Sequence, residues 1–337
     1  MLKYTILTVA LVISNSAILA TESFVYREGS SDRSFVEQVR NLNNGTLQEK
    51  IAAIEILKKA RTKRALRPMI LALKGVTTHV AEPTKAQTQE ISKNENYAPI
   101  NFDISDNNKP VIKYLAAQAL ADLGHDMAIK PLADTYKVLA EQVKKDKDQR
   151  IYYSEMEKLP AVVAAGEVLR SMGYLLDPHE DKDALAVLEG ALAHEHYYIR
   201  ASAAEALRNT NRESTLGALE AASNGEKDDY AKTVMLGSIV GIKKTKNIQF
   251  FALLDMLKNI SPVVRIKASS LLGELGIANS ETHLRQAMMI EDNLHVRDQL
   301  RKDIGIITGY QIPNAPSASY NTSADERDRN KKSDDMK

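Results

Sequence analysis

The chain of 337 residues is 44% hydrophobic but only 5% aromatic, without tryptophan, so its core must be mainly Ala, Leu, Ile and Val, which favours helix packing over a β-sandwich. Its 45 basic and 44 acidic residues nearly cancel, so net charge does not attract nucleic acid or an anionic membrane in bulk. The absence of cysteine excludes disulfides, thiolate metal sites and a cysteine nucleophile.

The N-terminus, MLKYTILTVALVISNSAILATES, looks like a secretory signal peptide. Lys3 precedes an apolar run from Ile6 to about Ala20 that is interrupted by three polar residues. Such a run is a poor membrane span, which needs roughly 20 apolar residues. We predict that residues 1–20 are cleaved, with a retained anchor as the alternative, and that 21–31 form a linker. Without a lipoprotein cysteine, the expected product is a bacterial periplasmic or secreted protein with no stable membrane insertion after cleavage.

From residue 32 onward, apolar residues recur at the spacing of amphipathic α-helices. The first helix is predicted at 32–44 and the second at 50–60. Taken two by two, the helices form about seven pairs, and the later copies lie about 31 to 39 residues apart, as in a helical solenoid. The remaining helices are predicted at 65–75, 110–124, 128–139, 160–173, 181–195, 198–210, 213–225, 229–242, 247–259, 262–276, 280–292 and 294–307.

Four residues mark predicted helix ends. Pro262 belongs to the first turn of its helix, and Gly276 suits a left-handed C-terminal stop. Asp181 and Ser280 are predicted N-caps, because their side-chain oxygens can accept from the first free backbone N–H groups of a helix.

Three of the helical stretches share one frame. They are PVIKYLAAQALADLG (110–124), YIRASAAEALRNT (198–210) and PVVRIKASSLLGELG (262–276). The frame resembles the HEAT repeat, and most closely the short subclass first associated with phycobilin lyases. The resemblance covers about residues 32–309 and implies an all-α fold, an α-solenoid that winds as a right-handed superhelix of about seven HEAT-like helical pairs.

Two regions carry no repeat. The polar stretch 76–109 falls between the two helices of the second pair, and such an insertion is either functional or disordered. Its segment from Tyr97 to Ile104 holds apolar residues that favour docking as an ordered clamp, so both alternatives stay open. The charged tail 310–337 lacks apolar periodicity and is predicted to be disordered.

A basic residue recurs at the same place in the repeat. It serves either as an anion-binding ladder or as a structural rung that pairs with turn acids such as Glu195, Asp228 or Asp292. Recurrence in every unit favours the structural interpretation, because stacked repeats need the same interface chemistry. The recurring residues are Lys113, Arg200, Lys232, Arg265 and Arg297.

Histidines offer the nearest approach to a metal site. His194 and His196 flank Glu195, but His179 would stand at the other end of one helix, roughly 22 Å from His194. They cannot share a metal, and solvated turns are the favoured interpretation because metal sites need several converging ligands.

A HEAT-repeat enzyme gives a sharper comparison. Deoxyhypusine hydroxylase carries His and Glu iron ligands directly after the repeat arginine. In the aligned stretch IRASAAEAL, those two positions are Ala201 and Ser202. We therefore predict no metal, no cofactor and no catalytic residue, and that the chain is not an enzyme.

The resemblance implies that the second helix of each pair lines the concave side of the solenoid. We predict a non-catalytic scaffold or adaptor that binds a protein or peptide there, and no nucleic acid; a solvated face is the plain alternative. A diverged HEAT-repeat metalloenzyme or small-ligand enzyme is the other functional hypothesis. The candidate partner-binding residues, which face away from the core stripe, are Tyr114, Gln118, Glu167, Arg170, Glu205, Arg208, Ser270, Asp298 and Lys302.

Overall fold

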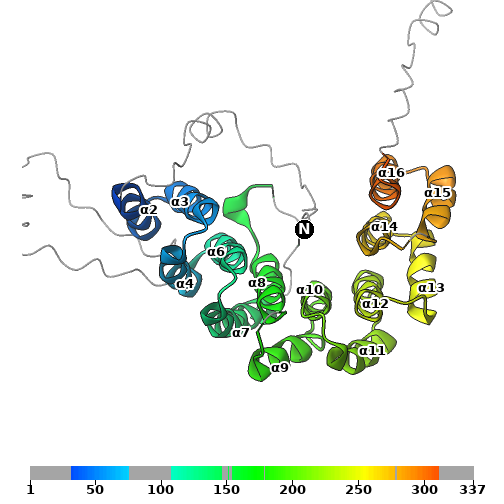
Figure 1. The fold of residues 1–337 in the computed structure, drawn as a ribbon, viewed down its shortest axis with the longest axis horizontal. Helices are drawn as coiled ribbons and strands as arrows, with labels where there is room; N and C mark the ends of the chain where they lie inside the picture. The colour runs from blue at the N-terminus through cyan, green and yellow to red at the C-terminus, as the bar shows by residue number, and fades with distance from the viewer. Residues whose placement is uncertain are drawn as a thin grey trace, which may run out of the picture. The chain divides into compact units, whose positions relative to one another are not determined.

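The computed structural model describes residues 32–75, 108–145, 151, 154–177, 179–277 and 279–310. These residues form 14 α-helices, joined by turns and short 3-10 helices, and no strand occurs among them (Figure 1). The predicted signal peptide and linker, residues 76–107 of the insertion, and the tail after residue 310 lie outside the described residues, so those predictions stay untested.

The helices divide into two units, residues 1–253 and 254–337. Five pairs belong to the first unit. Their first helices are α2 (Asp32–Asn44), α4 (Leu66–Lys74), α7 (Ile129–Lys145), α9 (Lys182–Ala191) and α11 (Leu216–Gly225). Their second helices are α3 (Leu47–Ala60), α6 (Pro110–Leu123), α8 (Ala161–Leu176), α10 (Tyr197–Asn209) and α12 (Asp229–Lys243).

The remaining helices complete the array. They are α13 (Ile248–Asp255), which contains the boundary between the units, α14 (Pro262–Leu275), α15 (Ser280–Ile290) and α16 (Leu294–Thr308). The 3-10 helices are η1 (Lys63–Ala65), η3 (Asp126–Ala128), η4 (Met156–Lys158), η5 (Glu213–Thr215) and η6 (Met256–Lys258).

In the first unit the helices form two rows (Figure 1). Each second helix packs against the second helix of the next pair, from α3 through α6, α8 and α10 to α12. Small side chains allow this close stacking: Ala116, Ala164 and Ala203 are all fully buried between neighbours. The second-helix row is therefore the continuous element that displays side chains from successive repeats side by side.

The second unit is built in the same way. Helix α14 packs against α16, α15 packs against α16, and η6 packs against α14. Val264, Ala268 and Leu272 on α14 and Leu300 and Ile304 on α16 are buried. The apolar stripe predicted for residues 262–276 is thus the core face of its helix.

The predicted fold class is confirmed: the chain is an all-α solenoid of helical pairs. Pro262 opens α14 and Gly276 ends it with a φ of 62°. Asp181 caps α9 and accepts from the Ala184 backbone N–H at 2.9 Å. The prediction for Ser280 was wrong, because the N-cap of α15 is Asn279 and Ser280 is its buried first residue.

Among the described residues, none of the helices combines the length and the apolar character that crossing a bilayer requires.

Candidate functional site

The repeated arginine is held inside the fold by a fixed set of partners. Arg200, in the first turn of α10, binds both carboxylate oxygens of Glu226 through Nε and Nη2, at 2.6 and 2.7 Å. Its Nη1 donates to the carbonyls of His194 and Glu195 at 2.9 and 2.8 Å. The Arg200 pair lowers the pKa of Glu226 although burial opposes this. The structural interpretation of the repeated arginine is therefore supported at this position.

The same arrangement recurs in the second unit. Arg265 binds both oxygens of Glu291, at 2.7 and 2.8 Å, and donates to the carbonyls of Asn259 and Ile260. In both units the acid lies 26 residues after the arginine. The turn acids proposed from the sequence, Glu195, Asp228 and Asp292, are not the carboxylates that these arginines bind.

Two lysines at this place in the repeat donate to backbone carbonyls. Lys113 donates to Leu73 at 3.1 Å, and burial lowers the pKa of Lys113. The buried Lys50 donates to Asn43 at 2.9 Å. Sequence analysis missed Lys50, because the helix was expected to begin at residue 50 when it begins at Leu47. Lys50, Lys113, Arg200 and Arg265 are each the fourth residue of a second helix, which is the signal that identifies the set.

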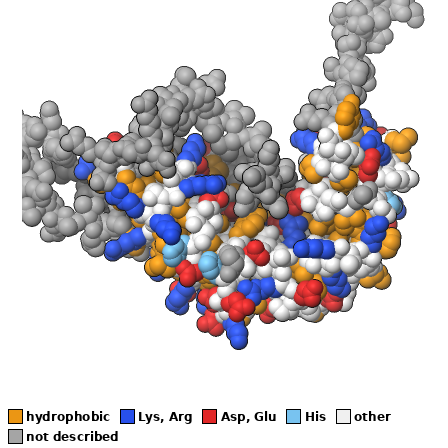
Figure 2. All heavy atoms as spheres, in the orientation of Figure 1, with side chains coloured by type: hydrophobic (Ala, Val, Ile, Leu, Met, Phe, Trp, Pro, Cys, Tyr) orange, Lys and Arg blue, Asp and Glu red, His pale blue; other side chains and the backbone are white. Residues whose placement is uncertain are grey.

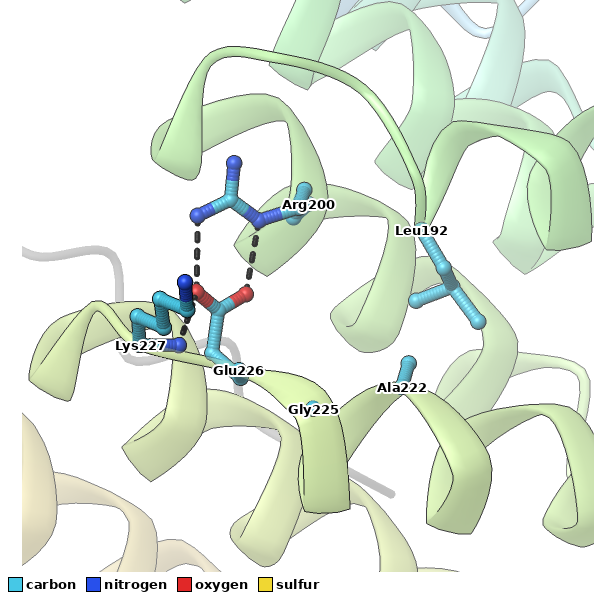
Figure 3. A pocket seen from close by; sticks show the side chains of 6 residues that line it. All are labelled: Leu192, Arg200, Ala222, Gly225, Glu226 and Lys227. Carbon is cyan, nitrogen blue, oxygen red and sulfur yellow. Dashed lines mark hydrogen bonds and ion pairs between the residues drawn. The ribbon is translucent and has the colours of Figure 1, made fainter.

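A shallow pocket of about 230 Å³ lies beside the Arg200–Glu226 pair (Figure 3). Arg200 already uses four of its five N–H donors on protein acceptors. Arg200 itself therefore offers little hydrogen-bonding capacity to a ligand in this pocket. It is lined by Leu192, Arg200, Ala222, Gly225, Glu226 and Lys227.

Replacing Arg200 with methionine should lower the free energy of unfolding by about 2 kcal/mol, because Glu226, whose side chain is 3% exposed, loses its only bidentate partner. Urea unfolding followed by circular dichroism measures the change. The double variant Arg200→Met/Glu226→Gln should recover part of the loss. Lys144→Met removes an exposed pair with Glu141 and should change little; equal losses in both single variants would contradict the assignment.

The second-helix row carries a polar network centred on Arg170 of α8. Its Nε donates to Glu167 at 3.2 Å, and its Nη1 donates to Ser202 at 2.9 Å and to Glu205 at 3.3 Å. Its Nη2 donates to the Tyr198 hydroxyl at 3.2 Å, and the guanidinium lies over the Tyr198 ring. We call these five residues the Arg170 cluster. It joins α8 to α10 and brings together three of the predicted site residues, Glu167, Arg170 and Glu205.

Close packing brings the two helices near enough for this network. A Cβ added at Gly166 would lie 2.6 Å from the Ser202 hydroxyl and 2.8 Å from the Tyr198 ring. Burial opposes the charge of Arg170, but Tyr198, Glu167 and Glu205 hold its pKa well above the ordinary value. The side chains of Arg170, Glu167 and Glu205 are 20%, 15% and 13% exposed. The guanidinium is thus a permanently charged and partly accessible group.

A smaller network lies on α6, one helix along the row. Gln118 donates to the Tyr114 hydroxyl at 3.1 Å, and Lys58 of α3 donates to Gln118 at 3.3 Å. Lys58 also pairs with Asp122 at 3.7 Å. Tyr114 and Gln118, both predicted site residues, are therefore in contact with each other.

Four further residues were predicted for the site. Arg208 is half-buried on α10. Ser270 donates to Glu274 at 3.4 Å, the exposed Asp298 accepts from Arg301 at 2.6 Å, and Lys302 is exposed. Ser270, Asp298 and Lys302 belong to the second unit, so the candidate site of the first unit does not include them.

Sequence analysis missed Tyr198 and Ser202 as members of the site. Ser202 was considered only as a position where an iron ligand is missing. The spacing of Tyr198, Ser202 and Glu205, four and three residues apart, places them on one helix face, and this signal identifies both residues once Glu205 is chosen.

The histidines act as caps. His196 is the N-cap of α10, and its Nδ1 accepts from the Tyr198 backbone N–H at 3.2 Å. His194 Nδ1 accepts from the His196 N–H at 3.0 Å, and burial lowers the pKa of His194. Within the described ranges, no three His, Cys, Asp or Glu side chains lie close enough together to hold a metal ion.

Neither a family model nor a curated protein matches this chain. Among solved structures, it is similar to a chain described as "The structure of the complex of CpcE and CpcF of phycocyanin lyase from Nostoc sp. PCC7120". The sequences are 15% identical, the alignment covers 86% of this chain and 98% of that chain, and the TM-score is 0.46. At these values the likeness concerns the arrangement of helices alone.

This comparison corrects one prediction. The plain statement that the chain is not an enzyme was wrong, because a similar array of helices occurs in a structure described as a lyase. A helical solenoid supports catalysis as well as binding, so the fold does not place the chain outside the enzymes. The described residues form an array of paired helical repeats.

Proposed function

We propose that the chain binds a protein or peptide partner on the second-helix row of its first unit, with the Arg170 cluster at the centre of the contact. The observation that carries the proposal is the cluster itself, in which one guanidinium is fixed by four side chains from two successive repeats. Arg and Tyr are the residue types that most often dominate the binding energy of protein interfaces.

Preorganisation supports this assignment. The side chains of Arg170, Glu167 and Glu205 are already held by mutual bonds, so a partner does not have to order them. Ordering a free side chain at an interface costs about 0.5–1.5 kcal/mol. A cluster that is rigid before binding therefore offers affinity that flexible surface residues do not.

Variation along the row supports specific recognition. The Tyr114–Gln118 pair lies on α6, Glu167 and Arg170 on α8, and Glu205 on α10. Repeats with similar cores therefore carry different polar side chains on the second-helix row. Such variation is expected of a surface that recognises one partner specifically.

To identify the partner, benzoylphenylalanine is placed at Arg208, next to the cluster, and crosslinked products are captured from native extracts. The affinity of the chain for the purified partner is then measured. Arg170→Met should then weaken binding by about tenfold or more, since central Arg residues at interfaces contribute about 2 kcal/mol or more. Tyr198→Phe, which removes one hydroxyl, should have a smaller effect in the same direction.

Lys137→Met, an exposed change on α7 in the other row, is the matched control and should bind as the wild type does. Thermal melts establish that each variant is folded. Wild-type affinity in a folded Arg170→Met protein, or crosslinks no more specific at Arg208 than at Lys137, would refute the proposed surface.

We also propose that the protein is exported, on the support of the signal-like sequence of residues 1–20. Intact-mass measurement of the protein from fractionated cells tests this. A periplasmic or secreted product that lacks about 20 N-terminal residues is expected, and a full-length cytoplasmic product contradicts it.

A further inference from the structure

The turn from α3 to α4 has an unusual concentration of positive charge. Ten consecutive residues, 58–67, include six basic residues and no acid. Five of the six are exposed, and the sixth, Lys58, pairs with Asp122. We call this segment the basic corner. Figure 2 shows Lys and Arg side chains over this part of the first unit. Its basic residues are Lys58, Lys59, Arg61, Lys63, Arg64 and Arg67.

Helix electrostatics explain only half of these charges. Lys58 and Lys59 lie in the last turn of α3 and Arg61 is its C-cap, where the helix dipole favours cations. Lys63 and Arg64, however, form the start of η1, and Arg67 lies in the first turn of α4. Helix N-termini carry positive partial charge and favour anions, so these three residues are placed against the local field.

Equivalent turns in the same chain carry an acidic residue where this turn carries a lysine. η3 begins with Asp126 and η5 with Glu213, at the position that Lys63 occupies in η1. The segments match residue for residue, since TKRALRP at 62–68 aligns with HDMAIKP at 125–131. The fold therefore accepts an acid at this position and does not require a cation there.

We propose that the basic corner binds an acidic segment of a polypeptide, and this inference rests on the proposed function of binding a protein. Carboxylates are complementary in charge to the exposed Lys and Arg side chains of the corner. Arginine binds carboxylates in a bidentate manner, and two of the outlying cations, Arg61 and Arg67, are arginines. Phe35, under the guanidinium of Arg64 at 4.7 Å, adds an apolar contact beside the charges.

The extent of the positive surface favours a peptide over an extended polyanion. The next turn along the chain carries Asp122 and Asp126, and the following one carries Glu180, Asp181 and Asp183. Asp122 lies directly beside the corner, 3.7 Å from Lys58. A bilayer or a nucleic acid would span several such turns and meet repulsion at the acidic ones, whereas a short acidic segment contacts one corner.

The test is a fluorescence-anisotropy titration of the full chain with a labelled peptide of twelve alternating Glu and Asp residues. The corner variant is Lys63→Asp/Arg67→Gln. The control is Lys182→Asp/Lys130→Gln, which makes the same change in charge in the first turns of α9 and α7. The wild type and the control should bind the peptide, and the corner variant should bind about tenfold more weakly or not at all.

The melting temperature is a second measurement. If Lys63 and Arg67 served only to stabilise the fold, replacing them would lower the melting temperature. Because Lys63 stands at a helix N-terminus, the corner variant should melt a few degrees higher than the wild type while it loses binding. A lower melting temperature together with unchanged binding would overturn the proposal.

Vesicles of phosphatidylcholine and phosphatidylglycerol and a 20-nucleotide single-stranded DNA are titrated in parallel. Tighter binding to either than to the peptide, lost in the corner variant, would overturn the choice of a polypeptide, as would equal loss in corner and control. The Arg170→Met variant separates the two proposals. Arg170→Met should bind the acidic peptide as tightly as the wild type does. If the Arg170 cluster turns out not to bind a partner, the result of this peptide titration does not change.

Discussion

Replacing Gly173 with alanine is expected to lower the free energy of unfolding of the first unit by about 3 kcal/mol. A Cβ at Gly173 would lie 2.7 Å from the carbonyl carbon and from the Cα of Ala206 on α10. These are backbone atoms, which no rotamer change can move aside. Helices α8 and α10 would have to separate along a tightly stacked and buried contact.

The same substitution at Gly190 is the matched control. Gly190 lies in α9, and a Cβ there meets nothing within 4 Å. Alanine at this position should raise stability by up to about 1 kcal/mol, since alanine has the higher helix propensity. Urea unfolding of both variants measures the two changes. If alanine raised the free energy of unfolding at both positions, helix propensity, and not the contact with Ala206, would govern position 173.

Gly173 also shows where sequence analysis reaches its limit. The helix was expected to end there, as the matching helices end at Gly124 and Gly276, both of which have positive φ. Instead α8 continues to Leu176, with Gly173 buried inside it. A glycine after a Leu-rich turn gives the same local sequence pattern whether it ends a helix or lets another helix pack closely. The choice depends on Ala206, which lies 33 residues later in another repeat.

The helices themselves were predictable because their signals are local. Each second helix has its own apolar stripe, and residues such as Pro262 and Asp181 mark ends within one turn. The position of the repeated arginine was predictable for the same reason. Its partners were not, since Glu226 and Glu291 lie in the turn after the following helix, 26 residues away, and the length of that helix and turn fixes the register.

The candidate site divides in the same way. A helical wheel puts Glu167, Arg170 and Glu205 on the faces of their helices that point away from the core stripe, but it gives no sign that the three side chains meet. Their contact depends on Gly166, which lets Ser202 and Tyr198 approach α8. Periodicity therefore identifies which face is polar, while the network on that face depends on how closely two helices approach.

In the second unit, the buried carboxyl of Asp303 should make stability fall as pH rises through the weakly acidic range. Asp303 on α16 is 1% exposed, accepts from Ser269 and Gln299, and has no cation among its bonded partners. Burial raises the pKa of Asp303 from 3.8 to about 6, although both hydrogen bonds favour the ionised form. Glu274 adds to the rise and Lys302 opposes it.

The sign follows from proton counts. Between pH 3.8 and about 6 the folded protein keeps the proton on Asp303 while the unfolded chain has lost it. Because the folded state then binds more protons, the free energy of unfolding decreases with rising pH over this window, by about 3 kcal/mol in total. Below the window both states are protonated and the contribution is constant, and above it the full cost is present.

Asp303→Asn removes the charge and keeps the shape, and its amide, like the protonated acid, offers one accepting oxygen and one donating group. At pH 7 the variant should be more stable than the wild type by up to about 3 kcal/mol, and the two should converge near pH 4. Asp298→Asn on the same helix is the control, since Asp298 is exposed. Chemical denaturation at several pH values measures the difference. An Asp303→Asn protein that is less stable at pH 7 would mean that the carboxylate has a favourable partner when ionised.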